Sequence, residues 1–92
     1  QNTAPFIHVD KADDENKIII DLRPFDNNEK NIEVKTNGNM VTINGAGEKN
    51  SHKGQEITRY SQTFAFGEKI NSDEITKVRQ NNEYIITIPF ID

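Results

Sequence analysis

Apolar residues recur at every second position along most of this chain of 92 residues. A spacing of two places side chains on one face of a β-strand, and isoleucine, valine and threonine, which favour strands, fill these runs. Signals for helices are nearly absent. The pattern predicts seven strands, over residues 6–10, 17–22, 32–35, 40–44, 56–66, 75–80 and 84–90.

Polar segments separate these runs, and two of them are short enough for hairpins. Asn37-Gly38 and Asn81-Asn82 tolerate the positive φ that two-residue hairpin turns require. We therefore expect strands three and four, and strands six and seven, to be antiparallel neighbours. Many short strands at this spacing favour an all-β, immunoglobulin-like antiparallel sandwich with about seven strands.

Smaller features refine this prediction. Tyr60, Phe64 and Phe66 share one parity within a predicted strand, so we expect them to point inward. Their expected partners in the core are Ile18, Ile20 and Leu22 or the strand neighbours of these residues. The segment 45–47, which contains two glycines, predicts a bend or bulge where two strands meet. Residues 72–74 are too few for a stable helix and predict a loop or one 3₁₀ turn.

Charge and composition limit the classes of partner and the cellular location that we expect for the chain. The chain has 11 basic and 15 acidic residues, interspersed, for a net charge of −4, which argues against nucleic acid as a partner. No apolar run reaches the ~18 residues of a membrane span, and no signal peptide pattern is present. The chain has no cysteine, which suits a reducing compartment, and we expect cytoplasmic localisation. Because it begins with Gln1, we expect an excised fragment.

Candidate chemistry is sparse. His8 and His52 are the only histidines, and neither has a second ligand nearby in the sequence. The acidic run 13–15 is interpreted as a solvated turn, since a calcium loop needs oxygen ligands at a defined spacing. No nucleophile elbow or phosphate-binding loop is present. The sequence therefore predicts no catalytic residue, no metal site and no cofactor.

Three stretches, in order, resemble the α-crystallin domain of the small heat shock protein family. Residues 17–25 are similar to its strand ending Asp-Leu-Pro-Gly-Phe, and residues 39–45 to its strand Leu-Thr-Ile-Ser-Gly. Residues 75–89 are similar to the signature that ends Gly-Val-Leu-Thr-Val-Thr-Leu-Pro, with residues 82–89 in register with that ending. Asn82 replaces the signature glycine and can still take positive φ, Tyr84 replaces a leucine, and Lys77 replaces an alanine. The resemblance predicts a divergent α-crystallin domain over residues 5–92, after a short remnant 1–4.

The resemblance implies an ATP-independent holdase that binds partly unfolded client proteins without a cofactor. In the family, a groove between two strands receives an Ile-x-Ile or Ile-x-Val motif from the C-terminal tail of another subunit. The groove candidates here, for clients or for the tails of a longer parent protein, are Ile32, Val34, Ile75 and Val78. Ordinary core packing is the alternative role for these residues. With no such tail after residue 92 and no long apolar arm before the first strand, we expect no large cages.

The resemblance also implies a homodimer. After Gly45 the chain has room for the rest of one strand, a turn at 50–54 and a single extended run at 55–66, without residues for an exchanged strand. This spacing resembles the animal type of dimer, in which one long strand pairs antiparallel with its copy. The candidate interface residues are Glu56, Ile57, Thr58, Arg59, Tyr60 and Ser61. Glu56 and Arg59 are expected to approach their counterparts across the two-fold axis.

Two alternatives remain open. A p23-like co-chaperone docking module would usually carry a C-terminal tryptophan, which this chain lacks. An adhesion or carbohydrate-binding sandwich would more often expose aromatic platforms, whereas the shared parity of Tyr60, Phe64 and Phe66 indicates core packing.

Overall fold

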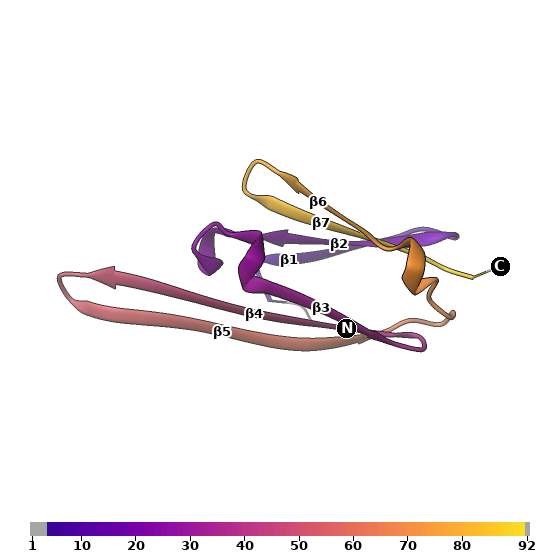
Figure 1. Ribbon diagram of the computed structural model, residues 1–92, viewed down its shortest axis with the longest axis horizontal. Helices are drawn as coiled ribbons and strands as arrows, with labels where there is room; N and C mark the ends of the chain where they lie inside the picture. The colour runs from indigo at the N-terminus through magenta and orange to yellow at the C-terminus, as the bar shows by residue number, and fades with distance from the viewer. Residues whose placement is uncertain (1–3, 92) are drawn as a thin grey trace.

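The computed structural model describes residues 4–91. Its strands form two antiparallel sheets that lie face to face, as the sequence predicted (Figure 1). One sheet has the order β1 (Ile7–Lys11), β2 (Glu15–Asp21), β7 (Glu83–Pro89) and β6 (Thr76–Gln80). The other has the order β3 (Ile32–Asn37), β4 (Met40–Ser51) and β5 (Gly54–Ala65). The only helical elements in the described part are the 3₁₀ turns η1 (Arg23–Phe25), η2 (Glu29–Asn31) and η3 (Ser72–Glu74).

The two predicted hairpins are confirmed. The β3–β4 pairing ends with Asn37 opposite Met40, and the β6–β7 pairing ends with Gln80 opposite Glu83. Positive φ falls on Asn81, at 54°. Asn82, which tolerates positive φ, does not adopt it here. The 3₁₀ turn predicted at residues 72–74 is confirmed as η3.

The expected bend or bulge at residues 45–47 is wrong. β4 runs through this segment in unbroken register, with Gly45 opposite Tyr60 and Gly47 opposite Thr58. The glycines instead allow a close approach to η1. A Cβ atom at Gly47 would lie 2.1 Å from the carbonyl oxygen of Pro24, and one at Gly45 would lie 2.7 Å from the ring of Phe25.

The core fills the space between the inner faces of the two sheets. The predicted residues Ile18, Ile20, Leu22 and Phe64 are fully or almost fully buried, and Phe66 is 8% exposed. Tyr60 is partly buried against this core, with its ring edge-on to that of Phe6 at a centroid distance of 5.1 Å. The shared inward parity of the three aromatic residues on and after β5 is therefore confirmed. The other fully buried residues are Phe25, Val41, Ile43, Ile86 and Ile88.

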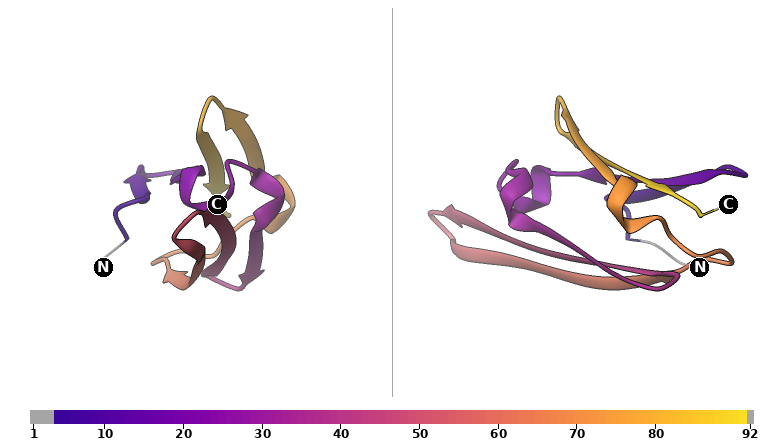
Figure 2. Two further views of the ribbon diagram at one scale, coloured as in Figure 1. Left: turned by 90° about the vertical axis from the view of Figure 1, so that its left-hand side faces the viewer. Right: turned by 45° about the vertical axis from the view of Figure 1, so that its right-hand side comes forward.

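The β4–β5 hairpin extends beyond the body of the sandwich. β3 begins at Ile32, opposite Gly45, so residues 46–59 pair only within the hairpin. Figure 1 shows this hairpin passing under the η1 and η2 turns and projecting past them. The molecule is accordingly elongated, 53 × 23 × 20 Å. The tip of the β6–β7 hairpin points away from the other sheet (Figure 2).

Candidate functional site

Each sheet has two free edges, β1 and β6 in one and β3 and β5 in the other. A free edge presents unpaired backbone N–H and C=O groups to which another extended chain can pair. The edges β3 and β6 lie on the same side of the molecule and border one cavity of about 290 Å³. The residues that line this β3–β6 cleft are Val34, Thr36, Ser72, Ile75 and Lys77.

The register explains which side chains reach the cleft. Val34 lies opposite Ile43, and Lys77 lies opposite Ile86. Both partners are completely buried, so Val34 and Lys77 extend from the inner faces of their sheets, because residues opposite each other in a sheet share a face. Ile75, two residues before Lys77, is partly buried against the core. The cleft therefore combines two apolar side chains and two hydroxyl side chains with one cationic side chain.

Of the predicted groove residues, the structure brings Val34 and Ile75 together along this cleft. Ile32 is 9% exposed and belongs to the core. Val78 is 53% exposed and lies opposite Ile85, whose neighbour Ile86 points into the core. Val78 is thus on the outer face of its sheet, away from the cleft.

Sequence reasoning missed Thr36, Ser72 and Lys77 as lining residues. The signal that could have found two of them is the period of two along each strand. Counting in steps of two from Val34 leads to Thr36, and from Ile75 to Lys77. Ile75 and Val78 are three positions apart, so they cannot share one face of a strand.

A second cation, Arg79, lies on β6 two residues after Lys77. Arg79 also extends from the inner face of β6, opposite the partly buried Tyr84. Its Nη1 lies 3.4 Å from Oε2 of Glu29, and its Nη2 donates to Oδ1 of Asn27 at 3.0 Å. The Arg79 and Glu29 side chains are only 30% and 36% exposed. This contact ties the β6–β7 hairpin to the connection between the sheets, and the positive charge of Arg79 is already paired.

The single extended run predicted after the turn at 50–54 is confirmed as a continuous edge strand, β5. All six candidates, Glu56, Ile57, Thr58, Arg59, Tyr60 and Ser61, lie on it. Ile57 is 53% exposed. Burial raises the pKa of Tyr60 above its usual value, because the charged phenolate is disfavoured away from water.

The expected attraction between Glu56 and Arg59 across a two-fold axis does not follow from this strand. Glu56 lies opposite Lys49, and Arg59 lies opposite Ala46. Because the two residues are an odd number of positions apart, their side chains leave opposite faces of β5. In a dimer about a two-fold axis normal to the sheet, a residue lies on the same face of the sheet in both copies. Glu56 of one copy and Arg59 of the other therefore lie on opposite faces and cannot be direct partners.

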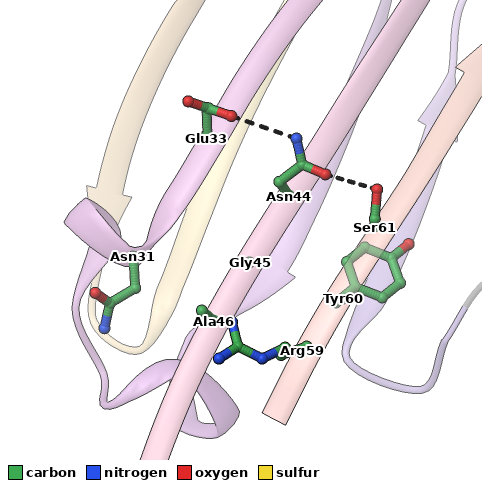
Figure 3. A pocket seen from close by; sticks show the side chains of 8 residues that line it. All are labelled: Asn31, Glu33, Asn44, Gly45, Ala46, Arg59, Tyr60 and Ser61. Atoms are coloured by element: carbon green, nitrogen blue, oxygen red, sulfur yellow. Dashed lines mark hydrogen bonds between the residues drawn. The ribbon is translucent and has the colours of Figure 1, made fainter.

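A hydrogen-bonded row of polar side chains crosses the outer face of β3, β4 and β5 (Figure 3). The Asn44 amide donates to Oε1 of Glu33 at 3.3 Å and accepts from the Ser61 hydroxyl at 2.6 Å. This row lines an open hollow of about 530 Å³, which Arg59 also borders. The row orders Ser61 at the free edge of β5. Among residues 4–91 the hydrogen-bond partner of that hydroxyl is an amide and not a general base, so the arrangement does not activate a nucleophile.

The two histidines lie elsewhere. His8 on β1 contacts the Asp10 carboxylate at 2.6 Å, and its side chain is 70% exposed. His52 lies in the exposed tip between β4 and β5. Within residues 4–91, no group of three or more His, Cys, Asp or Glu side chains is placed to hold a metal ion. The same residues contain no helix that is long and apolar enough to cross a membrane.

Comparison with known proteins identifies the fold. No family model matches the sequence, and no curated protein matches it. Among solved structures, heat shock protein 16.0 from Schizosaccharomyces pombe is similar with a TM-score of 0.77 and 20% identity, over 99% of this chain and 90% of that one. A small heat-shock protein from Xylella fastidiosa gives 0.75 and 17%, over 98% and 88%. The rat alpha crystallin domain gives 0.63 and 14%, over 100% and 93%.

These likenesses show that the chain has the fold of the α-crystallin domain, as the resemblance in the sequence predicted.

Proposed function

We propose that this domain is an ATP-independent holdase that binds partly unfolded proteins and keeps them from aggregating. The observation that carries the proposal is the β3–β6 cleft, a groove between two edge strands in an α-crystallin fold that presents the apolar side chains of Val34 and Ile75 among polar ones. A protein that begins to unfold exposes apolar side chains and unpaired backbone together. An extended segment of such a client can place its apolar side chains against Val34 and Ile75 and pair its backbone with a free edge.

Within a longer parent protein, the same cleft is proposed to receive C-terminal tail motifs of other subunits. A tail and a client would then compete for one surface, which gives the holdase a simple means of regulation. We further propose that the domain forms a homodimer through β5 and acts in the cytoplasm. The dimer leaves β3 and β6 free, because β5 lies at the opposite edge of its sheet from β3.

The test measures light scattering by a heat-labile client protein in the absence of ATP. The domain is expected to suppress the scattering, and the double substitution Val34→Ser and Ile75→Ser is expected to weaken that suppression. Val78→Ser is the matched control, since Val78 lies on the outer face of the same region. Urea unfolding of each variant shows whether a change in stability explains the result.

The proposal is contradicted if the wild-type domain fails to suppress the scattering at every ratio to client. If a domain without such suppression formed a stable complex with an ATP-driven chaperone, the co-chaperone docking function would replace the holdase function. Equal loss of suppression in the Val78→Ser control and in the cleft variant would show that clients bind outside the cleft.

A further inference from the structure

The β3–β6 cleft of the proposed function contains a cation whose charge is unpaired within the described chain. Lys77 lines the cleft from the inner face of β6, and residues 4–91 show no ion pair for it. The neighbouring Arg79 is paired with Glu29. We infer that Lys77 makes the cleft selective for extended apolar segments that carry a carboxylate next to their apolar side chains. This inference rests on the proposed role of the cleft as a binding groove.

The surrounding charges leave Lys77 available. Lys35 and Glu33 of β3 pair with each other at 3.4 Å, on the outer face of the sheet, because both alternate with the inward Val34. Asp73 and Glu74 in η3 are close in sequence to Lys77 but form no ion pair with it within the described part of the chain. A ligand that brings a carboxylate into the cleft would therefore meet an ammonium group with no competing partner.

The chemistry of lysine suits this role. Its aliphatic stem can lie beside Val34 and Ile75 while its ammonium group stays in contact with water. An extended ligand alternates its side chains, so a residue next to an apolar anchor points toward the mouth. A carboxylate at that position gains the attraction, whereas a lysine there meets repulsion. The cleft thus discriminates both for acidic segments and against basic ones.

The positive charge of Lys77 is opposite in sign to the net charge of the whole chain. A net charge of −4 disfavours acidic ligands at long range, so an acidic preference at the cleft has to come from a nearby cation. Coulomb attraction at a partly exposed pair is modest, and we expect a difference of about two- to fivefold in affinity. The preference should weaken as salt is raised, because salt screens exposed charges.

The experiment compares three labelled peptides that share an isoleucine-x-isoleucine core and differ only in the residues beside each isoleucine, which are glutamate, glutamine or lysine. Fluorescence anisotropy with the full chain gives the Kd of each. The glutamate peptide is expected to bind about two- to fivefold more tightly than the glutamine peptide, and the lysine peptide more weakly than both. Lys77→Gln should remove these differences, and Lys77→Glu should reverse the order.

Lys17→Glu is the matched control, because it makes the same change in net charge on the outer face of β2, next to the buried Ile18. Its peptide preference should stay that of the wild type. Equal binding of the three peptides to the wild type, or a reversal by Lys17→Glu as complete as that by Lys77→Glu, would overturn the inference and leave the cleft as a binding groove. Failure of all three peptides to bind would overturn the proposed role of the cleft as a binding groove. Suppression of client aggregation would be judged separately by light scattering.

Discussion

At the scale of single residues, Gly47 lies where β4 passes η1, and no side chain fits there. A Cβ atom would lie 2.1 Å from the carbonyl oxygen of Pro24 and 2.8 Å from Cα of Phe25, both backbone atoms that cannot rotate away. We expect Gly47→Ala to lower the free energy of unfolding by about 1–3 kcal/mol, as overpacking does. Urea unfolding measures the change.

Gly67→Ala is the control for this substitution, because a Cβ atom at Gly67 would meet nothing within 4 Å. A compatible glycine-to-alanine change reduces the freedom of the unfolded chain, so this variant should be neutral or slightly more stable. Equal urea midpoints for the two variants would show that β4 can move away from η1 at little cost.

Tyr60 and Tyr84 give the fold a dependence on alkaline pH. Burial raises the pKa of both, and the negative charge of Glu29 adds to the effect at Tyr84. Because folding raises the pKa of each tyrosine, the stability linked to its neutral form is fully present below the pKa of the unfolded chain, about 10. It is lost as pH rises through the folded value. We expect urea midpoints to fall in this range, and Tyr60→Phe to reduce the fall.

Ultraviolet titration of tyrosinate provides an independent reading. Both tyrosines in the folded chain should ionise above the pH at which free tyrosine does. Because the Tyr60 hydroxyl also donates a hydrogen bond to Gln62, Tyr60→Phe should cost some stability at neutral pH while it flattens the alkaline fall. Ionisation of both tyrosines at the ordinary pKa would contradict the role given to burial.

At the scale of elements, the strands could be predicted because each presents one face to the core. Alternation marks which residues face inward, and β2 illustrates this with Ile18 and Ile20 completely buried on either side of the half-buried Ile19. The continuation of β4 to Ser51 could not be read in the same way. Residues 46–51 are largely polar or glycine, and they remain a strand because each pairs with a residue of β5. Pairing between strands leaves no periodic apolar signal where the residues on both faces are polar or lack a side chain.

The cleft was only half predictable for a related reason. Apolar character was a sound guide to Val34 and Ile75, which pack against the core. It failed at Val78, because the edge strand β6 reverses the usual arrangement and carries Lys77 and Arg79 on its inner face. Charges that point inward on an edge strand discourage pairing with unrelated chains. A binding groove needs an accessible edge that does not aggregate, and a charged inner face is compatible with both requirements.

At the scale of the whole molecule, the free edges differ in how well they are protected. β1 and β6 are five residues each, and β6 carries inward charges. β5 is twelve residues long and continuous, and it forms one side of the projecting hairpin. A long, regular and uncovered edge is the one most prone to pair with another chain. Pairing with a second copy about a two-fold axis would cover it on both molecules at once.

We therefore expect a symmetric dimer held mainly by backbone hydrogen bonds along β5, and a pair of proline substitutions tests it. Successive N–H groups of a strand point to opposite sides, so of Thr58 and Arg59 one donates toward β4 and the other toward the free edge. Proline removes the donor. One variant should therefore sediment as a folded monomer at micromolar concentration, while the other should lose stability because its pairing with β4 is damaged. A monomeric wild type would contradict the dimer, and two folded dimeric proline variants would place the interface on another edge.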